Sequence, residues 1–92
     1  MYDKLTNVPQ KPGIYLFKDK NNKTLYVGKA KELRNRLRSY FRKSSVSDAR
    51  KSAMIRDVSD FEYTVTENEL EAFLLEADLI KLHRPRYNIL LR

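Results

Sequence analysis

The residue with the most unusual predicted surroundings is Glu76. In a helix, the residues three and four positions away lie on the same side, and for Glu76 these are Ala72, Phe73, Leu79 and Ile80. A carboxylate within an apolar stripe is costly unless a cation or strong hydrogen-bond donors compensate it. Two interpretations follow: a buried ion pair with an arginine, or a metal site in which one carboxylate suffices because a phosphate supplies further oxygen ligands.

A second group of residues could act on a phosphate beside Glu76. Arg36 and Tyr40 are four residues apart, so they share one side of a helix, and a guanidinium can hold two oxygens of one phosphate. Tyr15 and Tyr26 lie in apolar, β-branched segments, where a tyrosine is also a common core residue. A tyrosine is a poor base at neutral pH unless a cation such as Lys29 lowers its pKa.

The overall charge favours a polyanionic partner. The 92 residues carry 19 Lys and Arg against 12 Asp and Glu, a net charge of +7, which makes nucleic acid the first candidate partner. A helical stripe of basic residues faces solvent or a bound polyanion, and with Lys31 it forms the candidate nucleic-acid-binding set: Arg34, Arg38 and Arg42. The absence of cysteine and the single histidine exclude a disulfide framework and the usual Cys/His zinc sites.

The elements that must position these residues follow from hydrophobic periodicity and turn residues. Residues 14–18 and 24–27 predict two strands of a hairpin, and residues 61–66 predict a third strand. After Gly28 the apolar positions 33, 37, 40 and 41 indicate a helix with a basic stripe. Residues 43–52 begin as a polar loop, and residues 48–57 predict a second helix. Asn68 and Glu71 favour the start of a long amphipathic helix over residues 69–83, which Pro85 ends.

This order predicts an α/β (α+β) fold, with a small three-stranded antiparallel sheet flanked by helices in the order β-β-α-α-β-α. Residues 1–92 are expected to form a single domain. The tail, residues 84–92, stops without a cap or turn, so we expect an N-terminal fragment of a longer chain. Without a signal peptide or membrane-length apolar run, we expect a cytoplasmic protein with no membrane partner.

Two triplets carry a family resemblance. Gly13-Ile14-Tyr15 in the first predicted strand and Tyr26-Val27-Gly28 in the second resemble the signature of the GIY-YIG endonuclease superfamily, with Val27 in place of isoleucine. The resemblance continues through residues 28–40, 76–81 and 84–88. Over that ordered set the chain is most similar to the branch formed by the N-terminal domains of UvrC, the incision subunits of bacterial nucleotide excision repair.

The resemblance implies a metal-dependent DNA endonuclease. Glu76 would be the sole protein ligand of one divalent metal ion, Mg²⁺ or Mn²⁺. Around the scissile phosphate it places Tyr15, Tyr26, Lys29, Arg36 and Tyr40 as catalytic residues. Asn88 would lie near the site and contact DNA. The cut would be the one on the 3′ side of a lesion, the partners would be DNA, UvrB and UvrA, and the fragment itself would be a monomer.

Two alternatives remain open on the sequence. A homing, restriction or branched-DNA nuclease would use the same core, although residues 76–88 favour the repair branch. A non-catalytic basic module would use the arginine stripe only to bind a nucleic-acid backbone. Such a module would show no cleavage with any metal, and replacing Glu76 would leave it unchanged.

Overall fold

The computed structural model describes residues 2–42 and 49–90 of the chain. Their order along the chain is α1 (Tyr2–Thr6), β1 (Gly13–Lys18), β2 (Thr24–Ala30), α2 (Leu33–Phe41), α3 (Ala49–Asp57), β3 (Asp60–Val65), α4 (Glu69–His83) and α5 (Arg86–Leu90). No helix in the described ranges is long and apolar enough to cross a membrane.

The three strands form one antiparallel sheet in the order β2-β1-β3, so the predicted sheet is confirmed. In the central strand, Tyr15 lies opposite Gly28 of β2 and Tyr63 of β3. Since side chains alternate along a strand, these three residues share one face of the sheet. The sheet therefore brings the glycine of the second triplet next to the tyrosine of the first.

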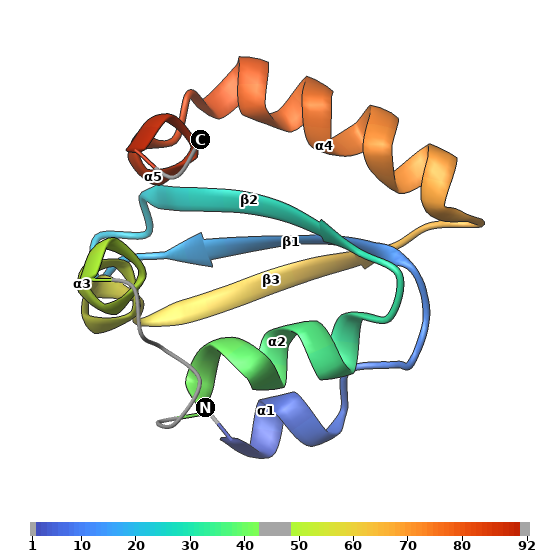
Figure 1. Cartoon of the computed structure of the whole chain (residues 1–92), viewed down its shortest axis with the longest axis horizontal. Helices are drawn as coiled ribbons and strands as arrows, with labels where there is room; N and C mark the ends of the chain where they lie inside the picture. Colours follow the sequence, from blue (N-terminus) through green and yellow to red (C-terminus); the bar gives the residue numbers. More distant parts are fainter. Residues whose placement is uncertain (1, 43–48, 91–92) are drawn as a thin grey trace.

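The helices cover both faces of this sheet (Figure 1). On one face α4 packs over a small cluster that contains Ile14, Leu16 and Val27. On the other face α1 and α2 cover a larger cluster that includes Tyr15 and Phe17. The tyrosines of the hairpin thus lie on the α2 side, whereas Glu76 comes from the α4 side.

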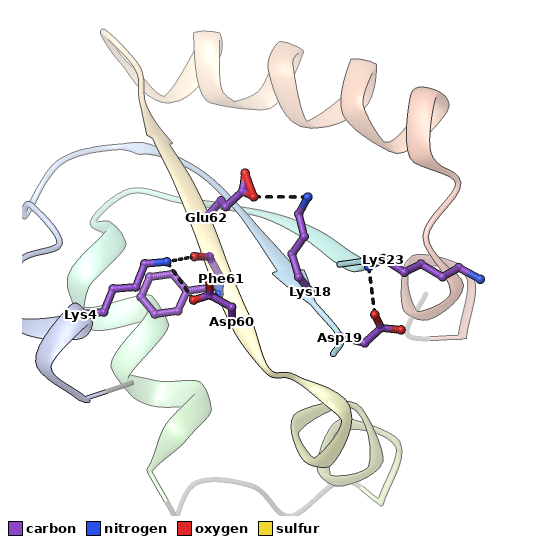
Figure 2. Close-up of polar contacts among 7 residues, drawn as sticks. All are labelled: Lys4, Lys18, Asp19, Lys23, Asp60, Phe61 and Glu62. Atoms are coloured by element: carbon purple, nitrogen blue, oxygen red, sulfur yellow. Dashed lines mark hydrogen bonds and ion pairs between the residues drawn. The ribbon is translucent and has the colours of Figure 1, made fainter. Parts of the chain in front are cut away.

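Polar contacts hold the outer strand β3 to the rest of the fold (Figure 2). The ammonium group of Lys4 in α1 donates to the Asp60 carboxylate at 2.9 Å and to the Phe61 carbonyl oxygen. The hydrogen bond from Lys4 lowers the pKa of Asp60. On the α4 side, Lys18 pairs with Glu62 at 3.3 Å and links β1 to β3. Strand β3 is therefore linked to α1 on one face and to β1 on the other.

The hairpin turn between β1 and β2 is also closed by a side chain (Figure 2). The Asp19 carboxylate accepts the backbone N–H groups of Asn21 and Lys23 at 2.8 and 2.9 Å. Asn22 has a φ of 63°, a left-handed conformation that asparagine adopts more readily than most residues. The polar turn that the sequence predicts is confirmed.

The long helix α4 begins and ends where its cap residues predict. The Asn68 side chain accepts the N–H of Glu71 at 2.8 Å. At the other end, Arg84 has a φ of 44° and donates its N–H to the Ile80 carbonyl oxygen at 2.8 Å. Pro85 follows this left-handed cap, so the helix cannot continue.

The predicted elements differ from the structure at the two ends and after the second strand. The short helices α1 and α5 add to the predicted order, because five-residue helices carry too few residues to show a helical period. Strand β2 runs through Ala30, beyond the predicted end at residue 27. The predicted helix 48–57 is confirmed from Ala49, while its first residue and most of the predicted loop 43–52 lie outside the described residues.

Candidate active site

Tyr15 forms the centre of the site, and Gly28 makes room for it. Its side chain is fully buried at 0% exposure, on the face that α2 covers. A methyl group on Gly28 would overlap the Tyr15 ring, because the phenol crosses directly over the glycine. A glycine inside a strand often marks such a close approach. The sequence motif contains Gly28, but only the strand register gives the physical reason for it.

Arg36 connects the two tyrosines that it was predicted to accompany. Its guanidinium donates to the hydroxyl of Tyr15 at 3.4 Å and to that of Tyr40 at 3.3 Å. The Tyr15 hydroxyl in turn donates to Tyr40 at 3.2 Å. The guanidinium also lies 5.1 Å from the Tyr40 ring centroid, a cation–π distance. Arg36 is exposed as a residue, so a ligand can reach it while the two tyrosines hold its guanidinium in place.

Four aromatic rings support this polar group. The ring centroids of Tyr15, Phe17, Tyr26 and Tyr40 lie between 5.0 and 6.4 Å apart in every pair. Such spacing is typical of favourable aromatic pairs, which restrict one another's orientation. Phe17 was not predicted as part of the site, although its place two residues after Tyr15 puts both on one face of β1.

Burial makes the tyrosine hydroxyls weaker acids. Burial raises the pKa of Tyr15 well above its ordinary value, and Tyr40 adds to the rise. The pKa of Tyr26 is also raised, first by burial and then by Tyr40, while Arg36 lowers it. For Arg36, burial would lower the pKa, but the neighbouring tyrosines, Tyr15 first, turn the net shift upward. At neutral pH the site therefore holds neutral phenols around a permanent cation.

Glu76 approaches this group from α4, across the edge strand β2. After burial and Tyr40, the negative charge of Glu76 adds a smaller contribution to the raised pKa of Tyr26. Within the described ranges, no ion pair or hydrogen bond involves the Glu76 side chain. The alternative of a buried ion pair with an arginine therefore has no support among these residues.

The predicted apolar stripe around Glu76 is only partly correct. Ala72 is buried and Leu79 and Ile80 are partly buried, but Phe73 is exposed and Glu76 itself is half-buried. The physical reason is the width of the sheet, because three strands are only slightly wider than one helix. One flank of α4 packs on the sheet, and the neighbouring flank reaches past its edge.

The chemistry at Glu76 fits a hard divalent cation. A carboxylate oxygen is a preferred ligand of Mg²⁺, which commonly keeps several waters and uses one or two protein carboxylates with substrate phosphates. Among the described residues there is no cluster of three or more His, Cys, Asp or Glu side chains. A metal at this place would therefore be held by Glu76 together with waters and substrate oxygens.

Asn88 lies beside the strand that carries Tyr26, and its expected contact with DNA stays a prediction. Its side-chain oxygen accepts the N–H of Val27 at 2.9 Å, and its side-chain amide donates to the Val27 carbonyl oxygen at 2.9 Å. Both polar groups of the side chain thus pair with the free edge of β2, as a neighbouring strand would. Through this pairing Asn88 positions the strand that carries Tyr26.

Two predicted lysines lie on the α4 side of the site. The Lys29 ammonium group lies 5.9 Å from the ring centroid of Phe73. Lys29 was expected to act on Tyr26, but Arg36 is the cation that opposes the rise in the pKa of Tyr26. Strand alternation explains this, because Lys29 is three residues from Tyr26 and so points to the opposite face. Lys31 is exposed and lies 3.9 Å from Glu69.

The predicted arginine stripe on α2 is less uniform than the sequence indicates. Arg34 is half-buried, and its Nε donates to the Val8 carbonyl oxygen at 2.7 Å, which fixes the segment after α1. Arg38 and Arg42 are exposed. Arg34 is therefore a structural residue in part, because a backbone carbonyl lies within reach of its position in the first turn of α2.

Comparisons with known proteins agree with this geometry. The model of the UvrC-like GIY-YIG domain matches residues 11–89. UvrABC system protein C of Caldicellulosiruptor saccharolyticus is 50% identical over 92 residues, which are 100% of this chain and 15% of that protein. The protein of the same name from Clostridium acetobutylicum is 51% identical over 88 residues, 96% of this chain and 14% of that protein. The chain thus spans about a seventh of these relatives.

Solved structures give the same result. The GIY-YIG N-terminal endonuclease domain of UvrC from Thermotoga maritima, bound to its catalytic magnesium ion, is 42% identical with a TM-score of 0.81. The match covers 94% of this chain and 92% of that domain. A point mutant of that domain, in which a tyrosine is replaced by phenylalanine, also holds its catalytic divalent cation and matches with a TM-score of 0.82. The chain therefore belongs to the family of UvrC-like GIY-YIG domains.

Proposed function

We propose that this chain is a metal-dependent DNA endonuclease domain that hydrolyses a phosphodiester bond, making the 3′-side incision of nucleotide excision repair. The observation that carries the proposal is the meeting of three groups at the edge of β2. Glu76 is without a protein partner among the described residues and its charge adds to the raised pKa of Tyr26, and Arg36 is held by Tyr15 and Tyr40. The Thermotoga maritima domain, an endonuclease with a catalytic magnesium ion, supports the same assignment.

The residues of the chain divide the chemistry of hydrolysis among them. Glu76 would hold one divalent ion, Mg²⁺ or Mn²⁺, which when bound supplies Lewis acidity toward the phosphate and its departing 3′ oxygen. Arg36 would stabilise the negative charge that develops on the phosphoryl oxygens. The attacking water adds to phosphorus as the bond to the 3′ oxygen breaks, leaving a 5′ phosphate and a 3′ hydroxyl.

The tyrosines and lysines would have supporting parts. With its raised pKa, Tyr26 is a neutral phenol at pH 7, so it would orient the attacking water through hydrogen bonds rather than act alone as a strong base. Tyr15 and Tyr40 would fix the guanidinium of Arg36. Lys29 and Lys31, with Arg38 and Arg42 on the other side of the sheet, would bind DNA phosphates.

The names of the relatives also bear on partners. They are C proteins of UvrABC systems, which supports DNA and the UvrB and UvrA proteins as partners of the longer protein. Damage recognition would then come from those partners, since contacts of lysine and arginine side chains with phosphates carry no sequence information.

The test is the replacement of Glu76. Glu76→Gln should remove Mg²⁺- or Mn²⁺-supported nicking of supercoiled plasmid, and it should weaken Mn²⁺ binding measured by electron paramagnetic resonance. Asp78→Asn is the matched control, because Asp78 is an exposed carboxylate two residues further along the same helix. Circular dichroism is the control that both variants should pass as folded proteins.

Each outcome decides between the candidates. Loss of metal binding and nicking in Glu76→Gln alone supports the nuclease. Wild-type nicking in Glu76→Gln would refute this assignment. DNA binding without nicking by the wild type, both alone and with UvrA and UvrB on damaged DNA, would favour the non-catalytic binding module.

A further inference from the structure

Phe73 is an exposed aromatic side chain next to the proposed metal ligand. It lies three residues before Glu76 in α4, so the two side chains are separated by about 4.5 Å along the axis and about 60° around it. Its side chain is 52% exposed. The other large apolar side chains that α4 exposes in the described structure are leucines: Leu70, Leu74 and Leu82. Phe73 is therefore the one exposed aromatic residue among the large apolar residues that α4 exposes in the described structure.

Basic groups surround this ring on the β2 side. The Lys29 ammonium group lies 5.9 Å from the ring centroid. Beside it, an open depression of about 250 Å³ is lined by Lys29, Ala30, Lys31, Glu69 and Ala72. Lys31 and Glu69 are 3.9 Å apart and both are largely exposed, so their attraction is weak and a phosphate can replace it. The depression thus offers two lysines next to an aromatic surface.

The direction of the elements places this feature along the path of the substrate strand. Helix α4 runs antiparallel to β2, so the step from Glu76 to Phe73 follows β2 from Tyr26 toward Lys29 (Figure 1). The axial step of about 4.5 Å exceeds the roughly 3.4 Å between successive nucleotides stacked in a duplex, so a strand that spans this step would be partly unstacked. A strand with its scissile phosphate at Glu76 would therefore bring a neighbouring nucleotide to Phe73.

We propose that Phe73 is a stacking platform for a base next to the scissile phosphate, with Lys29 and Lys31 binding the adjoining backbone phosphate. This inference rests on the proposed nuclease function. Any base can stack on an aromatic ring, so the contact would add affinity without sequence preference. A base paired inside a duplex is not accessible to such a ring. The ligand is therefore an unpaired or unstacked nucleotide, and the substrate at this step would be locally distorted DNA.

A tryptophan reporter tests the contact directly. The chain contains no tryptophan, so the emission of Phe73→Trp reports on this position alone. Titration with a single-stranded oligonucleotide, without divalent metal so that no cleavage occurs, should quench this emission with saturation. Leu82→Trp is the matched control, because Leu82 is 73% exposed and lies about 180° around the same helix from Phe73. It should be quenched much less.

Substitutions that separate stacking from simple apolar contact complete the test. Phe73→Ala and Phe73→Leu should each weaken oligonucleotide binding roughly tenfold, while Phe73→Tyr should keep it near wild type. Thermal unfolding of all three should stay close to wild type, since the ring is half exposed. Wild-type affinity in Phe73→Leu would show that the ring is not needed.

The outcomes also separate this inference from the function beneath it. If the wild type binds DNA and nicks it through Glu76 while Phe73→Trp is not quenched, or both reporters are quenched equally, the stacking platform is refuted and the nuclease stands. If the wild type neither binds DNA nor nicks it, alone or with its partner proteins, both proposals fall together. If a partner protein quenches the emission of Phe73→Trp and an oligonucleotide does not, this surface is a protein contact and the stacking platform is refuted.

Discussion

Helices α2 and α4 cover opposite faces of one small sheet, yet they differ in charge. Helix α2 carries three arginines and no acidic residue. Helix α4 carries four acidic residues and one lysine, in a chain with a net charge of +7. Helix α2 therefore brings a guanidinium suited to a phosphate toward the edge strand β2, and α4 brings a carboxylate suited to a metal.

They also differ in how firmly they are held. Leu33, Leu37 and Tyr40 of α2 are buried in the larger apolar cluster. In α4 only Ala72 is buried, with three partly buried apolar side chains packed against the same small cluster: Leu75, Leu79 and Ile80. The comparison indicates that protein contacts alone fix α2, which carries Arg36. Helix α4, which carries Glu76, packs less deeply and leaves its outer flank accessible to ligands.

The largest expected effect concerns this difference in packing. Leu37→Ala should lower the free energy of unfolding by about 3 kcal/mol, because Leu37 is 0% exposed and its removal leaves a cavity. Leu74→Ala on α4 should change it by less than about 0.5 kcal/mol, since Leu74 is 55% exposed. Urea unfolding followed by circular dichroism measures both. Equal losses would contradict the unequal anchoring of the two helices.

The same contrast explains what the sequence could predict. The basic helix after Gly28 has a regular apolar period, and the structure confirms a helix there, α2, at Leu33–Phe41. Helix α4 has correct bounds because Asn68 and Pro85 mark its ends, but it is apolar on several sides. Periodicity could not show which of those sides packs on the sheet, so Phe73 was expected near the core and is exposed.

The site could be predicted as a set of residues but not as a set of contacts. Arg36 and Tyr40 share a helix side, so their meeting follows from local geometry. The pairing of Asn88 with Val27 joins residues 61 positions apart, and no local pattern reports it. Arg34 appears as one more member of a basic stripe in the sequence, because its contact with Val8 depends on where the N-terminal segment folds back.

The next largest effect concerns Arg36 and tests whether the shape of its guanidinium matters as well as its charge. Arg36→Lys keeps the charge but cannot donate to Tyr15 and Tyr40 while facing a phosphate. Incision should fall about 100-fold, with little change in unfolding free energy. Single-turnover incision with and without partner proteins gives the measurement, with Arg38→Lys as the control. Activity within twofold of wild type, roughly the error of such assays, would show that charge alone suffices.

Alkaline titration tests the hydroxyls on the α2 side of the sheet. Burial raises the pKa of Tyr15 and Tyr26, whose unfolded value is about 10. Above about pH 10 the unfolded chain loses these protons while the folded chain keeps them. The contribution of the two tyrosines to the free energy of unfolding is therefore fully present below that pH and is lost as pH rises. Phenolate absorbance should show fewer than the six tyrosines ionising near pH 10 while the circular dichroism signal is intact. Ionisation of all six in the folded state would contradict a closed aromatic cluster.

The smallest effect belongs to the outer face of α2. Arg38 is exposed, so Arg38→Ala should leave stability and the chemical step unchanged. It should weaken DNA binding at low salt, and it should reduce by about one the slope of log affinity against log salt, because one phosphate contact is lost. Titrations at several salt concentrations between roughly 50 and 200 mM give this slope. An exposed charge on α4, removed by Asp78→Asn, should leave the slope unchanged or make binding slightly tighter. If Asp78→Asn and Arg38→Ala changed the slope equally, the two helices would not differ in their relation to DNA, and the division of charge between them would have no functional meaning.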